Sequence, residues 1–169
     1  IMMGKLLNAG QICISPDYVF LPEGKENEFV EHAKSYVQES YETLKNNPDY
    51  TSIIHLNHYE RLRSYISDAK SKGAEIVEIN PANEDLTQQE HHKIPPTLIL
   101  NPTDDMEVMK NEIFGPILPV MSYKNFDETI FDSQEEDKIC FACNKDIEKS
   151  SKFKIYKICS EKDCNFHFH

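Results

Sequence analysis

Residues 8–13, Asn8-Ala9-Gly10-Gln11-Ile12-Cys13, decide how the first part of this chain folds. The apolar residues before them predict a short helix, and Gly10 is expected to close it because glycine readily adopts the left-handed conformation that ends helices. A strand is expected to follow from about Asp17 to Leu21. Cys13 is therefore predicted to lie in a loop between a helix and a strand, where a thiol nucleophile could work.

A second informative stretch, residues 111–116, reads Asn111-Glu112-Ile113-Phe114-Gly115-Pro116. The apolar residues 116–121 follow it and predict a buried strand bounded by prolines, since proline is confined to the ends and edges of strands. Gly115 and Pro116 are expected to shape the turn before this strand.

Between the two stretches, helices and strands are expected to alternate. Apolar positions recur every three or four residues from 23 to 44, which predicts an amphipathic helix. Asn57 is expected to cap a second helix, which Gly73 ends. Four further segments are expected after it: a strand at 74–79, a loop over 80–96, a strand at 97–100 and a capped helical turn at 103–107. This order predicts an α/β fold.

The composition of the 169-residue chain limits its partners. A formal net charge of −11 argues against nucleic acid and anionic membrane surfaces, because both would repel an acidic protein. The sequence has no apolar run of transmembrane length and no secretory leader pattern, so we expect a cytoplasmic protein without a membrane span. Small molecules and other proteins remain open as partners.

The two stretches resemble motifs of the aldehyde dehydrogenase superfamily, whose active-site cysteine lies in an N-x-G-Q-x-C segment and whose second motif reads E-x-F-G-P. Their order and separation also match. The flanking residues 4–7 and 14–19 look most like the coniferyl-aldehyde-dehydrogenase branch. The resemblance implies an aldehyde dehydrogenase-like catalytic-domain fragment over residues 1–130, with an open, mainly parallel sheet and flanking helices, plus a short Cys-rich tail.

The same resemblance implies the NAD(P)-dependent oxidation of an aldehyde, a small-molecule substrate, to a carboxylic acid. Cys13 would be the catalytic nucleophile, because the thiolate attacks carbonyl carbon well. Hydride would pass to NAD or NADP, and water would hydrolyse the thioester left on Cys13. Glu112 would bind the hydroxyls of the nicotinamide ribose, and Phe114 would pack beside the nicotinamide.

These residues also have plainer interpretations. Cys13 has isoleucine on both sides and could be a buried small hydrophobic residue, since free cysteine is often buried. Glu112 could be a solvated residue in a turn. Asn8 and Gln11 are expected to tie the loop through bonds from their side-chain amides to the backbone, not to touch substrate.

Several parts of the family's site have no counterpart in this sequence. The general-base glutamate, the oxyanion-hole asparagine and the dinucleotide-binding domain all precede the cysteine by more residues than are present here. None of the five glycines belongs to a G-x-G-x-x-G turn that would bind pyrophosphate. We therefore interpret the chain as a piece of a catalytic domain. Family members form homo-oligomers, but the oligomerisation strand is also missing, so assembly is not implied for this fragment.

The resemblance ends near residue 131. Residues 131–138 are predicted to be an acidic linker, and residues 139–169 a Cys- and His-rich tail. The tail contains four cysteines whose spacing is typical of zinc modules: Cys140, Cys143, Cys159 and Cys164. An incomplete zinc finger is one interpretation, and free thiols in a reducing cytosol are the other. A catalytically inactive interaction module with a zinc-binding tail is accordingly the alternative function.

Overall fold

The structure, a computed structural model, describes residues 1–125, 138–139 and 146–147. The chain divides into two compact units, Ile1–Ser122 and Tyr123–His169. In the second unit, residues 138–139 and 146–147 form two short antiparallel strands, β5 (Lys138–Ile139) and β6 (Asp146–Ile147). Residues 131–137 of the predicted linker and the four cysteines of the tail lie outside the described residues, so the linker and the zinc site stay predictions.

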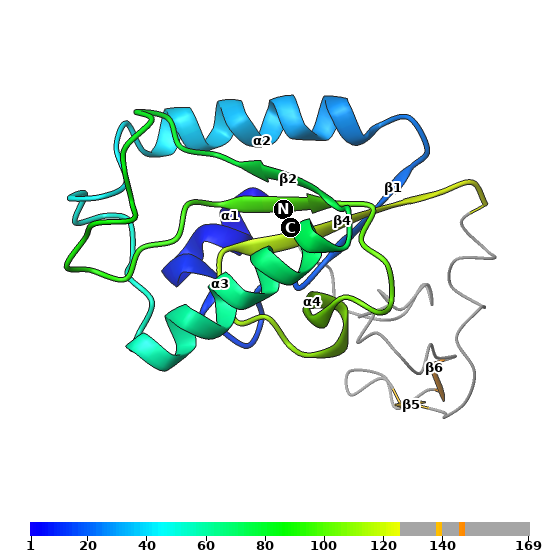
Figure 1. Ribbon diagram of the computed structural model, residues 1–169. Helices are drawn as coiled ribbons and strands as arrows, with labels where there is room; N and C mark the ends of the chain where they lie inside the picture. The colour runs from blue at the N-terminus through cyan, green and yellow to red at the C-terminus, as the bar shows by residue number, and fades with distance from the viewer. Residues whose placement is uncertain (126–137, 140–145, 148–169) are drawn as a thin grey trace. The chain divides into compact units, whose positions relative to one another are not determined.

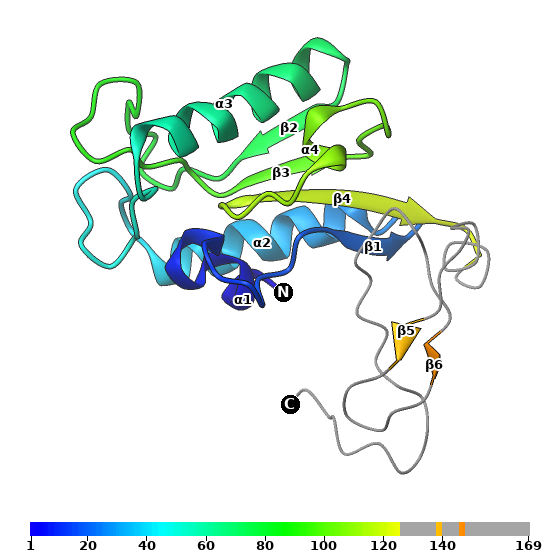
Figure 2. The ribbon, with the colours of Figure 1, turned by 90° about the horizontal axis from the view of Figure 1, so that it is seen from below.

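A four-stranded sheet forms the centre of the first unit (Figure 1), in the order β1-β4-β3-β2. Strand β3 pairs in parallel with β4, and β2 pairs antiparallel to β3 at one edge. Figure 2 shows the arrowheads of β1 and β4 at the same end, so the sheet is open and mainly parallel, as predicted. The strands are β1 (Val19–Pro22), β2 (Glu75–Glu78), β3 (Thr97–Leu100) and β4 (Ile117–Tyr123).

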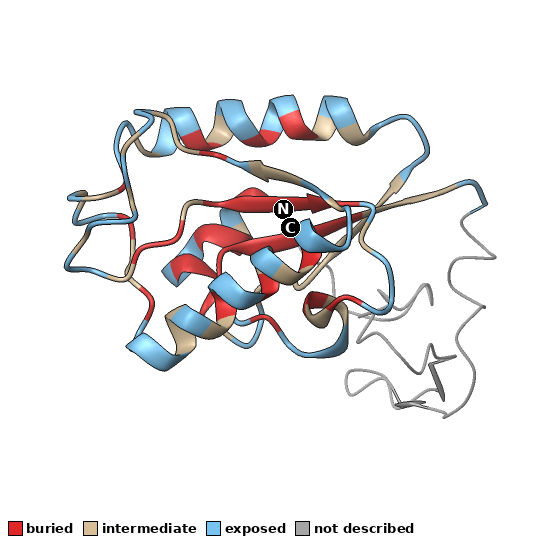
Figure 3. Cartoon of the chain, in the orientation of Figure 1, coloured by how far each residue is buried: buried red, intermediate tan, exposed pale blue. Residues whose placement is uncertain are grey.

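The two long helices, α2 (Glu26–Ser40) and α3 (Leu56–Ser71), cover opposite faces of this sheet (Figure 1). Side chains of successive strand residues point to opposite faces, so the central strands supply both cores. Leu98 and Leu118 pack with α2, whereas Ile99 packs with α3. Every residue of β3 is buried, which is typical of a parallel strand covered on both sides (Figure 3).

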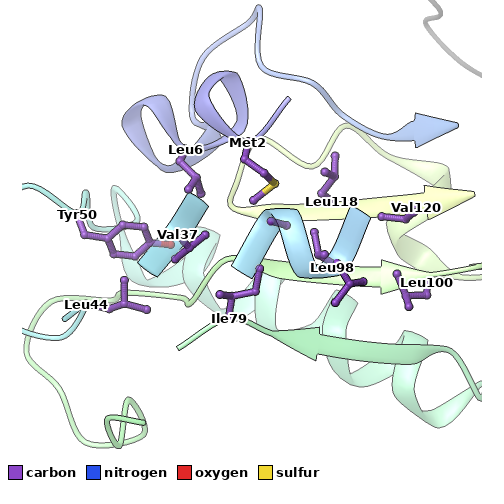
Figure 4. Packing of buried hydrophobic residues seen from close by; sticks show 12 residues of the cluster. Met2, Leu6, Val37, Leu44, Tyr50, Ile79, Leu98, Leu100, Leu118 and Val120 are labelled. Carbon is purple, nitrogen blue, oxygen red and sulfur yellow. The ribbon is translucent and has the colours of Figure 1, made fainter. Parts of the chain in front are cut away.

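The core under α2 also holds the first helix, α1 (Met2–Leu6). Met2 and Leu6 point into the same cluster as Val37 of α2 and Leu118 of β4 (Figure 4). The chain that leads into Cys13 therefore starts from a buried helix packed on the sheet. This arrangement gives the loop after α1 a rigid base.

One predicted helix cap is wrong. Helix α3 is capped by His55, whose Nδ1 accepts a hydrogen bond from the backbone N–H of His58 at 3.1 Å, so Asn57 lies inside the first turn. The turn at 103–107 forms, and the short helix α4 (Glu107–Lys110) begins at its end. The N-cap residue of α4, Met106, makes no side-chain capping bond. Instead, Asp68 of α3 accepts a hydrogen bond from the N–H of Glu107 at 2.8 Å.

Candidate active site

Cys13 is an exposed, free thiol. The interpretation of this residue as a buried small hydrophobic side chain is therefore wrong. Helix α1 ends before it, as predicted, and a 3-10 turn at Leu7–Gly10 follows. Asn8, Ala9 and Gly10 are all left-handed, with φ angles of 52°, 52° and 73°. The sequence indicated this conformation only for the glycine.

The side-chain amides of Asn8 and Gln11 tie the turn before Cys13, as expected from the sequence. Asn8 Nδ2 donates to the carbonyl of Gln11 at 3.2 Å, and Gln11 Nε2 donates to the carbonyl of Asn8 at 3.1 Å. Gln11 also spans to the segment before α3, where its Nε2 donates to Ser52 O at 3.0 Å and its Oε1 accepts from the N–H of Ile54 at 2.9 Å. Gln11 is buried, so its role is to hold backbone.

The second motif alternates outward and inward side chains. Glu112 is exposed, and the ring of Phe114 is 37% exposed. Ile113 between them is buried in the core under α3. Phe114 has a φ angle of 53°, an unusual conformation for a bulky residue. The turn therefore presents a carboxylate and an aromatic ring to solvent from a fixed backbone.

The structure brings the two motifs into direct contact through their glycines. A Cβ atom on Gly10 would lie 2.3 Å from the carbonyl oxygen of Gly115, which is closer than real Cβ atoms come to any backbone atom. Beyond Cys13, Asp17 Oδ1 accepts a hydrogen bond from the N–H of Ile113 at 3.1 Å. The Cys13 loop is thus held against the second motif on both sides of the thiol. Sequence reasoning found the motifs but missed Asp17.

Lys5 is a second residue that sequence reasoning missed. It is 1% exposed, and its Nζ donates to the carbonyl of Pro16 at 2.9 Å, beneath the Cys13 loop. Burial lowers the pKa of Lys5 from 10.5 to about 8, although the charge of Asp17 acts in the opposite direction. Helical spacing carried the signal, because Lys5 lies three residues after Met2 on the buried face of α1.

A pocket of about 240 Å³ lies elsewhere in the first unit, between α3 and the segment that contains Glu78, Glu84 and Lys93. None of the predicted site residues lines it. Among the described residues, no three or more His, Cys, Asp or Glu side chains form a group that could hold a metal ion. None of the described helices combines the length and the apolar character that a membrane span requires.

Comparison with known proteins agrees with the motifs. Residues 1–136 match the model of the aldehyde dehydrogenase family. A probable coniferyl aldehyde dehydrogenase of Caulobacter vibrioides is 57% identical over 130 residues, which cover 77% of this chain and 27% of the relative. The chain thus spans about a quarter of the length of the curated relatives that it matches.

Solved structures agree as well. The substrate-bound state of Staphylococcus aureus AldH superimposes with a TM-score of 0.67 at 33% identity, covering 80% of this chain and 28% of that one. An NADP-dependent glyceraldehyde-3-phosphate dehydrogenase from Bacillus halodurans, complexed with NADP, gives a TM-score of 0.64 at 25% identity, covering 82% of this chain and 28% of that one.

The contact between the motifs predicts unequal effects of two glycine substitutions. Gly10→Ala should lower the free energy of unfolding by more than about 3 kcal/mol, because it adds a backbone clash to an unfavourable φ angle. Gly24→Ala should lower it by only about 1 kcal/mol, since Gly24 has a φ angle of 84° but open space around it. Urea unfolding of both variants measures the difference. Equal losses would contradict the contact.

The buried ammonium of Lys5 predicts a pH dependence. Below about pH 8 the group is charged in both states, so folding carries the full penalty of burying it. Between about pH 8 and 10.5 the folded protein releases the proton while the unfolded chain keeps it, so stability rises with pH. The free energy of unfolding of the wild type, minus that of Lys5→Met, should therefore increase by about 3 kcal/mol across this interval.

Lys70→Met is the matched control, because Lys70 is exposed on α3. The wild type and this variant should show the same rise of stability with pH. A constant difference between the wild type and Lys5→Met would contradict the burial of a charged ammonium.

Proposed function

This chain belongs to the aldehyde dehydrogenase family, and we propose that it supplies the nucleophile and part of the cofactor site for oxidising an aldehyde to a carboxylic acid with NAD or NADP. The observation that supports this most is the contact between the two motifs. It holds the exposed thiol of Cys13 in a loop fastened to the turn that exposes Glu112 and Phe114. A nucleophile and a cofactor site must be neighbours for this reaction.

The residues of the second motif suit the cofactor that the family uses. The carboxylate of Glu112 is an acceptor that can bind two ribose hydroxyls, and it is exposed. The ring of Phe114 offers a partly exposed apolar face against which a nicotinamide could pack. Bound there, NAD or NADP would supply the hydride acceptor.

The remaining chemistry falls to Cys13. The Cys13 thiolate would add to the aldehyde carbon and form a hemithioacetal, from which hydride departs more readily than from a free aldehyde. Loss of hydride leaves a thioester on Cys13. Water then releases the carboxylic acid and restores the thiol. Each turnover therefore begins and ends with a free thiol, which fits a reducing compartment such as the cytoplasm.

We propose an aromatic aldehyde of the coniferyl type as the substrate. The support is the 57% identity to a probable coniferyl aldehyde dehydrogenase over 130 residues.

The nucleophilic role predicts a reactive thiol. In the full chain at neutral pH, Cys13 should be alkylated by iodoacetamide at least about tenfold faster than Cys143, because only a thiolate-favouring site accelerates the reaction. Peptide mass spectrometry separates the two sites, and Cys13→Ser removes one signal as the control. Equal rates would refute an activated nucleophile in this chain.

The cofactor role predicts that Glu112→Gln weakens NAD⁺ binding by about tenfold, since a charged acceptor makes stronger hydrogen bonds to hydroxyls than an amide does. Titration of the full chain with NAD⁺, followed by backbone NMR shifts at residues 112–116, measures the affinity. Glu90→Gln is the matched control, because Glu90 is exposed in the loop before β3. Unchanged affinity in Glu112→Gln, or no shifts in the wild type, would refute the role.

A further inference from the structure

Three consecutive carbonyl oxygens of the second motif accept hydrogen bonds from two side chains of α3. Arg61 donates from Nη1 to the carbonyl of Glu112 at 3.1 Å and from Nη2 to that of Ile113 at 2.7 Å. His58 Nε2 lies 2.7 Å from the carbonyl oxygen of Phe114. The backbone of residues 112–114 is thus fixed from the helix at every carbonyl.

His58 and Arg61 are also bound to each other, which settles the protonation of the imidazole. Arg61 Nε and Nη2 lie 3.3 Å and 3.1 Å from His58 Nδ1. A guanidinium only donates, so Nδ1 is the acceptor, and the proton of the neutral ring is on Nε2, where it is donated to Phe114 O. Burial lowers the pKa of His58, the bond to Phe114 opposes this, and the charges of Arg61 and His55 lower it further.

The turn requires such support because its conformation is unfavourable. Phe114 has a φ angle of 53°, which a bulky side chain holds only where its surroundings enforce it. The following Gly115 lies so close to α3 that an added Cβ would be 2.5 Å from Leu62 Cδ1. Leu62 directly follows Arg61, so the same turn of the helix supplies both the packing and the donors.

We infer that His58 and Arg61 are positioning residues of the cofactor site, which fix the backbone of residues 112–114 and so aim the side chains of Glu112 and Phe114. The inference rests on the proposed function, which makes those two side chains cofactor contacts. In this role neither His58 nor Arg61 touches the cofactor. A lysine could not replace Arg61 fully, because only the planar guanidinium places two donors against adjacent carbonyls.

Substitutions on one helix turn test the inference in the full chain. Arg61→Gln should speed amide exchange at Ile113 and Phe114 by about tenfold and weaken NAD⁺ binding by about tenfold, because it removes charge-assisted bonds to the turn. Arg61→Lys should recover part of both effects. Arg63→Gln is the matched control, since Arg63 is exposed and stacks on the ring of Tyr59 at 5.6 Å.

His58→Gln provides a second, milder variant, because it leaves the bond from Arg61 to the hydroxyl of Tyr65 in place. It should speed exchange at Phe114 and Gly115, with amides of β3 such as Leu98 and Ile99 unchanged. This variant keeps the inference testable if Arg61→Gln does not fold.

Three results would overturn the inference: turn amides that exchange equally in Arg61→Gln and Arg63→Gln, faster exchange that extends equally to β3, or a loosened turn with unchanged NAD⁺ affinity. If the wild-type chain does not bind NAD⁺, the proposed role of Glu112 in cofactor binding is refuted. Faster exchange confined to the turn in Arg61→Gln would then still show that α3 fixes this backbone.

Discussion

The site depends on the approach of two backbones, at Gly10 and Gly115. A side chain on Gly10 would clash with the carbonyl group of Gly115, and Gly10 in addition has a φ angle of 73°. A side chain on Gly115 would clash with Leu62 of α3. Backbone atoms in contact cannot adapt by changing rotamer, so the Cys13 loop and the Glu112 turn move together or not at all. Glycine at position 10 is therefore required by geometry before any chemistry is considered.

This contact is rigid because the second motif leads directly into the centre of the sheet. The N–H of Thr97 donates to the carbonyl of Pro116 at 2.9 Å, and Thr97 lies opposite Ile117 in the parallel pairing of β3 with β4. Ile113 is buried with residues of α3 in one core, while the helix before Cys13 is buried in the other. The two cores of the sheet thus hold the two halves of the site.

Local patterns predicted most of the fold and only the exposed half of the site. Helical periodicity located α2 and α3, and the run at 97–100 was the strand β3 itself. The motifs pointed to Cys13, Glu112 and Phe114 as candidates, and all three are exposed. The residues that support them were missed because their partners are far away in the chain: Asp17 bonds to a residue 96 positions away, and Arg61 to carbonyls 51 and 52 positions away. No local spacing encodes such pairs.

Lys5 is a buried charged residue beneath the Cys13 loop, and it costs the fold stability. An apolar side chain of similar size would avoid the penalty of burying an ammonium, so stability alone does not favour lysine there. The ammonium instead gives the carbonyl of Pro16 a donor in one defined place, and the nearby charge of Asp17 offsets part of the penalty. Asp17 also accepts a hydrogen bond from the N–H of Ile113. Lys5 and Asp17 together therefore fix the end of the Cys13 loop and its position against the second motif. The loop is held in one conformation at the expense of some stability.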